Sequence, residues 1–207
     1  MTLTRRHILS GAAALAGSLA LPGLALAQGA VPQQVADHFS SVKTMTGQFV
    51  QFGPRGEQTG GKFFLERPGK IRFDYEAPSP VQVKADGKSV VIHNRKLDTY
   101  DMYPLSQTPL NLLLAERIDV SKRVEDVKQD ADLLTIKMGD KSVFGDSKIT
   151  MMFDPQSYDL RQWTITDKQG KDTSVILIDV QEGVRFERRM FNIPYREIRA
   201  KRRGENN

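Results

Sequence analysis

Apolar and polar residues alternate along most of the chain after residue 44, and this alternation predicts β-strands. The clearest case is residues 71–76, where Ile71, Phe73 and Tyr75 alternate with charged side chains. A strand of this kind has one apolar face and one polar face, as strands of antiparallel sheets commonly do. The same pattern predicts further strands at residues 45–49, 62–67, 81–86, 89–93, 97–103, 133–138, 148–153, 160–166 and 173–180.

Turn residues separate these segments. Pro68-Gly69 ends one strand, and Asp86-Gly87 is a strong signal for a hairpin turn. About ten strands, spaced roughly 8–12 residues apart, are typical of an all-β sandwich or barrel. We see neither a repeat nor a linker in the series, so a single domain is predicted.

An amphipathic helix is predicted before the first strand. Val31, Val35, Phe39 and Val42 follow one another at spacings of four, four and three residues. This spacing places all four side chains on one face of a helix. The helix is predicted over residues 32–43.

A second, shorter helix is predicted where the regular strands stop. Thr108 can cap its start, with Pro109 at the first helical position, and four leucines follow between residues 110 and 114. A helix this short and rich in leucine is not stable alone, so it must lie on an apolar surface. The polar and charged residues 119–130 that come next are not predicted to form a strand.

The first 27 residues have the pattern of a cleaved secretory signal peptide. Arg5 and Arg6 precede an apolar stretch over residues 8–27, which closes with Ala25-Leu26-Ala27. The alternative is a membrane-spanning helix, but glycines, a serine and Pro22 dilute the apolar stretch. The arginine pair resembles a twin-arginine export signal, although general secretory signals can also carry two arginines. Cleavage leaves a single domain at residues 28–200 and a basic, polar tail at residues 201–207.

Charge is concentrated at the C-terminal end. Residues 185–207 contain eight basic and three acidic residues, a net charge of +5, whereas residues 28–184 sum to −2. An acidic-leaning body with a basic end does not favour nucleic acid as a partner. The basic end is predicted to be solvated and frayed; the alternative is a docking patch for anionic lipid or an acidic partner.

Few residues offer chemistry for an enzyme or a metal site. The chain contains no cysteine, which excludes disulfides, thiol catalysis and a lipid-modified N-terminal cysteine. His38 and His93 lie apart, on a predicted helix and a predicted strand, and Glu66, Asp74 and Glu76 fall on the polar faces of strands. Recognisable nucleophile, phosphate-binding and dinucleotide motifs are also missing. We therefore predict that the protein is not an enzyme, has no metal site and needs no cofactor.

Several segments in order resemble the periplasmic outer-membrane lipoprotein carrier family, LolA. They are the segments Gly47-Gln48-Phe49-Val50-Gln51, then residues 61–73, Ala85-Asp86-Gly87-Lys88 and residues 108–115. The likeness continues to Phe191-Asn192-Ile193-Pro194 and so covers nearly the whole mature chain. It implies a mainly β fold with a few helices, namely an incomplete antiparallel barrel covered by a helical lid.

The resemblance also implies a function and its partners. A member of this family is a periplasmic monomer whose apolar inner face receives the acyl chains of lipoproteins. It takes them from an inner-membrane lipoprotein-releasing ABC transporter and passes them to an outer-membrane lipoprotein receptor. The lipid-binding residues implied for this chain are Phe49, Phe63, Leu65, Ile71, Phe73, Tyr75, Val83, Leu110, Leu113 and Leu114.

Arg67 is implied to be the latch that holds the empty lid closed. Arg67 follows Phe63 and Leu65 at intervals of two residues, so its side chain should lie on the same, apolar face of the strand. A charge there needs hydrogen-bond acceptors, such as carbonyls at helix ends. The alternative is an arginine at a strand end that points to water, since Pro68 follows directly. The chain departs from the family at Phe73, where tryptophan is often found, and near Val91 and His93, where aromatic residues are usual.

The sequence is also compatible with two other functions. A similar half-barrel could serve as a sensor of envelope stress that binds a membrane-anchored regulator, although a second domain is not evident. The protein could also carry a different lipid, such as a polyisoprenoid or a sterol-like molecule. The receptor version of the fold is excluded, because it needs an acylated cysteine.

Overall fold

A single antiparallel sheet forms most of the protein. The computed structural model describes residues 27–119, 124–139 and 147–204, so nearly all of the predicted signal peptide lies outside the described residues. Within these ranges the strands are β1 (Thr44–Phe52), β2 (Gln58–Glu66), β3 (Lys70–Tyr75), β4 (Val81–Asp86), β5 (Ser89–Asn94), β6 (Thr99–Pro104), β7 (Val124–Gln129), β8 (Leu134–Gly139), β9 (Lys148–Phe153), β10 (Leu160–Thr166) and β11 (Asp172–Glu182). The helices are α1 (Ala27–Ser41), the 3-10 turn η1 (Leu105–Gln107), α2 (Leu110–Leu113) and α4 (Tyr195–Gly204).

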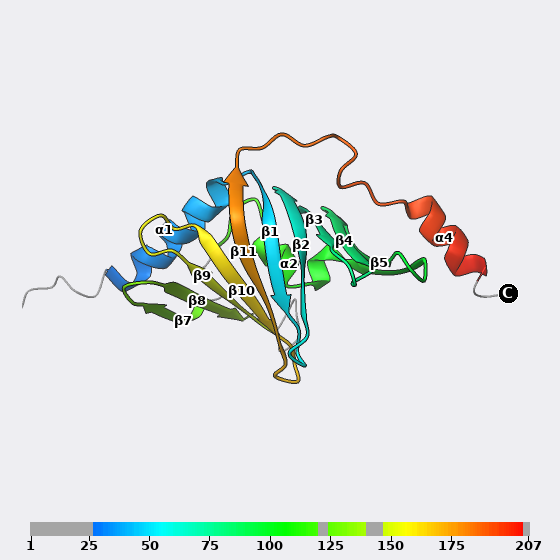
Figure 1. The fold of residues 1–207 in the computed structure, drawn as a ribbon. Helices are drawn as coiled ribbons and strands as arrows, with labels where there is room; N and C mark the ends of the chain where they lie inside the picture. The colour runs from blue at the N-terminus through cyan, green and yellow to red at the C-terminus, as the bar shows by residue number, and fades with distance from the viewer. Residues whose placement is uncertain (1–26, 120–123, 140–146, 205–207) are drawn as a thin grey trace, which may run out of the picture.

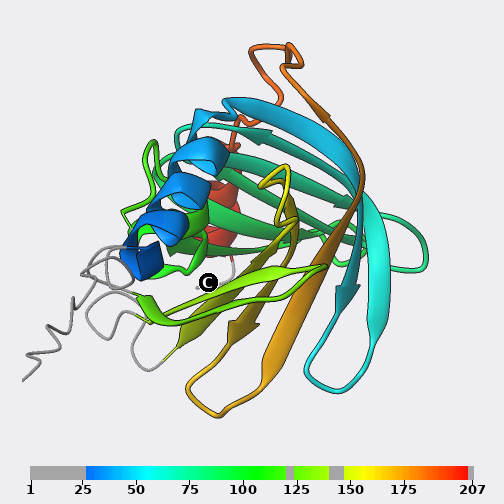
Figure 2. The ribbon, with the colours of Figure 1, turned by 90° about the vertical axis from the view of Figure 1, so that its left-hand side faces the viewer.

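The sheet is strongly curved and does not close into a barrel. Its strand order is β6-β5-β4-β3-β2-β1-β11-β10-β9-β8-β7, so β1 and β11 are neighbours at its centre (Figure 1). Figure 2 shows α1 lying across the open side of the curved sheet, next to the loop region that contains α2. The predicted fold, an incomplete antiparallel barrel with helices over its inner face, is confirmed.

Helix α1 uses its apolar stripe to cover the inner face of the sheet. Val35 and Phe39 are almost fully buried, and Val42, just beyond the helix, is also in the core. The helix lies closer to the N-terminus than the predicted range of 32–43: it begins at Ala27, includes Pro32 and ends at Ser41. The stripe itself was predicted correctly because its spacing of three and four residues is retained.

Strand β7 lies in the polar stretch for which no strand was predicted, so that prediction was wrong. The register pairs Val124 with Met138 and Val127 with Ile136, with a bulge between residues 124 and 126. A bulge adds one residue to its strand. Two valines three residues apart can therefore both pack against the core, although the period-two alternation is broken.

The capping prediction for α2 was also wrong. The Thr108 hydroxyl donates a hydrogen bond of 2.8 Å to the carbonyl oxygen of Leu105, in the preceding η1 turn. Pro109, not Thr108, occupies the N-cap position, and no side chain caps the helix. A threonine hydroxyl can bond either to a helix N-terminus or to a nearby backbone carbonyl. Here it bonds to the carbonyl oxygen of the preceding η1 turn, so it does not cap α2.

The C-terminal end contains a helix that the sequence did not predict. Residues 201–204, assigned to a frayed tail, belong to α4, which continues from Tyr195. Ile193 and Ile198 pack with Val91 in a small apolar cluster separate from the main core. Val90 belongs to the main core, and neighbouring residues of a strand face opposite sides, so α4 lies on the outer face of the sheet.

Candidate apolar binding site and its lid

Strand register brings most of the predicted lipid-binding residues onto the inner face. Phe63 pairs with Phe73, which in turn pairs with Val83. Leu65 pairs with Ile71 in the adjacent row. Directly paired residues face the same side of a sheet, so these rows form one continuous apolar surface.

Aromatic rings fill the middle of this surface. The ring of Phe49 contacts those of Phe73 and Tyr75 edge to face, each with 5.0 Å between ring centroids. Trp163 reaches Phe73 from β10 on the other half of the sheet, at 6.1 Å. Gly61 stands opposite Phe49 with φ of +157°, and a Cβ there would lie 2.0 Å from the carbonyl oxygen of Asp74. Glycine is therefore required at this crossing of strands.

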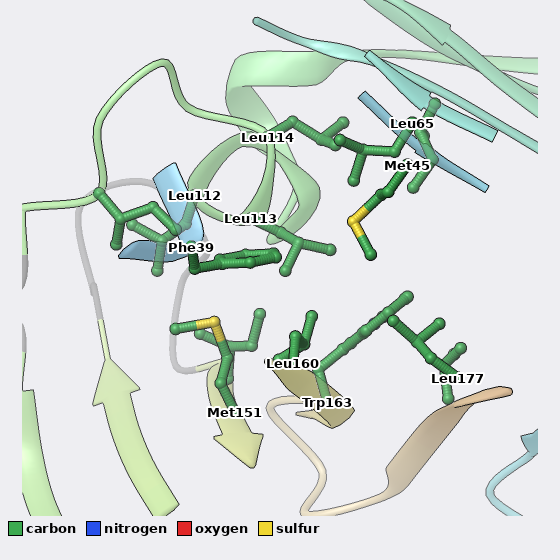
Figure 3. Packing of buried hydrophobic residues seen from close by; sticks show 14 of the residues in the cluster. Phe39, Met45, Leu65, Leu112, Leu113, Leu114, Met151, Leu160, Trp163 and Leu177 are labelled. Atoms are coloured by element: carbon green, nitrogen blue, oxygen red, sulfur yellow. The ribbon is translucent and has the colours of Figure 1, made fainter. Parts of the chain in front are cut away.

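The leucines of α2 and the residue after it close over the inner face. Leu112, Leu113 and Leu114 are buried, whereas Leu110 is half-buried. Figure 3 shows Leu113 beside Phe39 of α1, with Trp163 facing them from the sheet. The predicted lid is therefore built from α1 and α2 together, packed directly on the sheet.

Arg67 ties the sheet to both lid helices. It follows the last residue of β2, and its side chain is 6% exposed. The Nη1 group donates hydrogen bonds of 2.6 Å to the carbonyl oxygen of Leu113 and 2.9 Å to that of Ala115. The Nε group donates one of 3.1 Å to the carbonyl oxygen of Val42, just after α1. The alternative in which Arg67 points to water is wrong.

The environment of the Arg67 guanidinium is largely apolar. Its central carbon lies 4.3 Å from the centroid of the Phe39 ring, and its Nη2 group is buried without a hydrogen-bond partner among the described residues. Burial lowers the pKa of Arg67 from its ordinary value near 12.5 to about 10. The group therefore stays charged at neutral pH. A buried charge of this kind is stabilised mainly by the carbonyls of the closed lid.

Two further ties of the lid were missed by sequence reasoning. The backbone N–H of Gly69 donates a 2.9 Å hydrogen bond to the carbonyl oxygen of Leu114. The buried Ser40 hydroxyl donates to the carbonyl oxygen of Ala36 at 2.5 Å and accepts a 2.9 Å hydrogen bond from the N–H of Ile118. Ser40 thus joins α1 to the segment after α2. A lone serine at the end of a predicted helix carries no sequence signal for such a role.

A hollow of about 550 Å³ lies at the C-terminal end of α1, where His38 and Phe39 contribute to its wall. Apolar side chains from α1, β1, β10 and β11 contribute to its wall, while the wall's polar residues include His38, Asp159 and Glu182. The apolar residues of the wall include Phe39, Val42, Met45, Leu160, Leu177 and Val180. None of the ten predicted lipid-binding residues lines it.

The ten predicted residues lie together, but they form core and not an open cavity. Phe49, Phe63, Leu65, Ile71, Phe73, Leu113 and Leu114 are buried, and Tyr75, Val83 and Leu110 pack against them. The Tyr75 hydroxyl donates a hydrogen bond to Gln51, and burial raises the pKa of Tyr75 to about 12. Acyl chains could reach these side chains only after the lid moves, so their role as lipid ligands stays a prediction.

The histidines stand apart, as the sequence indicated. His38 on α1 lies 3.8 Å from the carboxylate of Asp159, and His93 on β5 stacks on Tyr100 with 4.2 Å between the ring centroids. In the described ranges we find no group of three or more histidine or carboxylate residues that could hold a metal ion. The helices described by the structure include none with the length and hydropathy to span a membrane.

Comparison with known proteins identifies the family. Residues 40–194 match the family model described as outer membrane lipoprotein carrier protein LolA. Three curated relatives are each named outer-membrane lipoprotein carrier protein. The one from Methylococcus capsulatus is 26% identical over 161 residues, covering 73% of this chain and 77% of that protein. The one from Chromohalobacter salexigens is 27% identical over 208 residues, covering 88% and 92%.

The third relative, from Chromobacterium violaceum, is 29% identical over 175 residues and covers 80% of this chain and 82% of its own length. The family match begins near the end of α1 and ends just before α4. It therefore includes the whole sheet, α2 and Arg67. On this evidence the chain belongs to the LolA family of outer-membrane lipoprotein carrier proteins.

Proposed function

We propose that this protein carries the acyl chains of lipoproteins through the periplasm, between the inner and the outer membrane. The observation that carries the proposal is an apolar inner face covered by a lid that one buried arginine, Arg67, holds with three hydrogen bonds. An ordinary core does not need a charged group at its boundary. At the boundary of a lid such a group has a use, because its few directional bonds can be broken and remade as the lid opens and closes.

The energetics of acyl burial explain why the empty form should be closed. Each buried methylene contributes about 0.8 kcal/mol, so three long acyl chains would contribute tens of kcal/mol. Reversible non-covalent binding does not exceed roughly 18–21 kcal/mol. Part of the binding free energy must therefore be used to open the protein. Separating Leu113 and Leu114 from the sheet, and Arg67 from its carbonyls, is such a use.

In this proposal Arg67 is the latch and the inner-face residues are the lipid ligands. Loading replaces contacts between the lid and the sheet with contacts to hydrocarbon, and the guanidinium gives up its carbonyl partners. Unloading is favoured because the closed lid restores three hydrogen bonds to a buried charge. The closed form competes with cargo, and this competition allows release.

The partners follow from the family role. We propose that the protein accepts acylated lipoproteins from an inner-membrane lipoprotein-releasing ABC transporter and delivers them to an outer-membrane lipoprotein receptor. It would act as a periplasmic monomer that is not an enzyme and needs no nucleic acid or cofactor. Removal of residues 1–27 as a signal peptide belongs to the same proposal, by either the twin-arginine or the general secretory route.

The test is uptake of a synthetic triacylated lipopeptide by the mature protein after removal of co-purified lipid. We expect a soluble complex with the triacylated peptide and none with the same peptide lacking acyl chains. Equal binding of the two peptides would contradict the proposal. Mass spectrometry of material that co-purifies from the native source would show whether a polyisoprenoid or another lipid occupies the protein instead.

A further inference from the structure

The segment between the end of β11 and the end of α4 carries a large unbalanced positive charge. Residues 185–204 include eight basic residues and only two acidic ones, Glu187 and Glu197. The seven arginines of this segment are all exposed: Arg185, Arg188, Arg189, Arg196, Arg199, Arg202 and Arg203. None of them forms an ion pair with a carboxylate among the residues that the structure describes.

Helix α4 is held in one orientation on the outer face of the sheet. Ile198 is buried against Val91, and the Tyr195 hydroxyl donates a 2.8 Å hydrogen bond to the carboxylate of Asp86. Lys201 forms an ion pair with Asp98 and also donates a 3.1 Å hydrogen bond to its carbonyl oxygen. The one lysine of the segment thus contacts the sheet, while the arginines remain free of it.

Three of these arginines lie on the part of α4 that faces away from the sheet. Successive residues advance by about 100° around an α-helix. Arg196, Arg199 and Arg203 are therefore turned about 100–160° around the axis from the buried Ile198, on the half of the helix that faces away from it. We call these three residues the basic face. In Figure 1 the segment after β11 runs along the top of the sheet, and α4 lies at the extreme edge of the molecule.

We propose that the basic face docks the protein on membranes that contain anionic phospholipid. Helix α4 carries five basic residues in all, three of them on the basic face. A cluster of four to eight basic residues on a helix is a typical recognition element for anionic lipid surfaces. Guanidinium groups suit it, because their planar donors match two oxygens of a phosphate at once. The basic face stands on a protruding helix and not within a groove, so it can meet a flat surface of phosphates with little rearrangement.

This inference goes beyond the carrier function and does not depend on it. The basic face lies on the outer side of the sheet, opposite the lid and the inner-face residues. Docking therefore requires neither an open lid nor bound cargo. For a protein that exchanges lipid with membranes, docking would raise the local concentration of carrier at the membrane surface.

The experiment measures co-sedimentation of the cargo-free mature protein with two kinds of vesicle. One is phosphatidylcholine alone, and the other is phosphatidylcholine mixed with phosphatidylglycerol. We expect binding only to the mixed vesicles, and loss of that binding as salt is raised. Arg196→Gln/Arg199→Gln/Arg203→Gln should weaken the partition coefficient by about fivefold for each arginine removed, on the order of a hundredfold in all.

A matched control removes the same charge elsewhere. Arg55→Gln/Lys168→Gln/Lys171→Gln neutralises three exposed cations in the β1–β2 and β10–β11 turns, which lie at the lower end of the sheet in Figure 1. We expect this variant to bind mixed vesicles within about threefold of the wild type, since its basic face is intact. Circular dichroism should show that both triple variants fold.

Three results would overturn the inference. The first is equal binding of the wild type to both kinds of vesicle. The second is an equal loss of binding in the two triple variants, which would mean that net charge alone is responsible. The third is no vesicle binding together with retention on immobilised polyglutamate through the basic face, which would identify an acidic protein as the partner. A failure of lipopeptide uptake would leave these results unchanged and would count only against the carrier function.

Discussion

The guanidinium of Arg67 and the carbonyl oxygen of Leu113 are joined by a 2.6 Å hydrogen bond inside an otherwise apolar boundary. Leu113 is fully buried, so its side chain packs in the core while its backbone carbonyl accepts the hydrogen bond from Arg67. Movement of α2 away from the sheet would break both contacts together. Opening should therefore be cooperative, and single substitutions at this contact should change the balance between the closed and open forms.

Arg67→Leu should accept cargo but release it slowly. Leucine keeps the apolar packing but donates no hydrogen bonds to Val42, Leu113 or Ala115, so the closed form competes less well with cargo. We expect the rate of transfer of a fluorescent triacylated peptide to acceptor vesicles to fall by at least about tenfold. This corresponds to a loss of about 1.4 kcal/mol in the free energy with which the closed form competes with cargo.

Arg117→Leu is the matched control for the latch. Arg117 also joins the lid segments, through a 3.0 Å bond to Asp37 on α1, but it is exposed to water. Exposed ion pairs contribute about 0.2–1 kcal/mol, so its loss should hardly change release. If the two variants transferred cargo at the same rate as the wild type, Arg67 would not be the latch.

Phe73→Glu should abolish lipopeptide uptake. The Phe73 side chain is 5% exposed between Phe63 and Val83, where a carboxylate would have no partner. Because this variant could fail to fold, Phe73→Leu is the second test: it should fold, and it should load with reduced affinity. Lys62→Glu, on the opposite face of β2, should load normally. Normal loading by a folded Phe73→Glu protein would contradict the inner-face role.

Ser40→Ala should lower the free energy of unfolding by about 1–3 kcal/mol, the effect of leaving a buried donor unpaired. The donor is the N–H of Ile118, which lies 2.9 Å from the Ser40 hydroxyl. Urea unfolding measures the change. Ser41→Ala is the control: its hydroxyl is exposed and donates to the carbonyl oxygen of His38, in the same helix, so a change within about 0.5 kcal/mol is expected. Equal effects at both serines would show that Ser40 does not join the lid segments.

The fluorescence of Trp163 should report loading directly. It is the one tryptophan of the chain, is 3% exposed, and contacts Phe73 on the inner face. Acyl chains that enter between lid and sheet must replace some of its present neighbours. We expect its emission to change in proportion to bound triacylated peptide and not with the unacylated peptide. Saturated binding without a change in emission would place the cargo away from this face.

Acid should weaken the fold partly through Asp154. Hydrogen bonds from the N–H groups of Ser157 and Gln156, and then one from Arg161, lower the pKa of Asp154 to about 2. A carboxyl group with a lowered pKa stabilises the fold above its unfolded pKa near 4, and the effect is lost as pH falls towards 2. Asp154→Asn should therefore flatten the decline in stability between about pH 4 and pH 2, measured by thermal unfolding. An unchanged decline would show that these bonds do not favour the ionised form.

The sequence predicted the sheet well because the alternation reports burial directly. Ile71 and Phe73 repeat at period two, and each is buried on the inner face. Strand β7 was not predicted because a bulge changes the spacing of Val124 and Val127. A bulge has no signature in a single sequence. The residue pattern alone did not predict that the sheet stays open; that expectation came from the family resemblance.

The candidate site was only partly predictable. Alternation placed Arg67 on the apolar side, but its acceptors are backbone carbonyls of Val42, Leu113 and Ala115, which no residue type identifies. Helix α4 was missed because Ile198 is its one buried apolar residue, too little for an apolar stripe. Its place on the sheet depends on tertiary contacts that form only in the folded chain.

The pairing of β1 with β11 has a consequence for how the protein folds. Strands β1 to β6 pair in chain order, and so do β7 to β11, so each half of the sheet can form from local hairpins. The halves join only when β1 pairs with β11, which brings together residues as far apart in the chain as Met45 and Glu182. Contacts between such distant segments form late and slow folding. The inner face, which needs both halves, should therefore be assembled only after β11 has been synthesised.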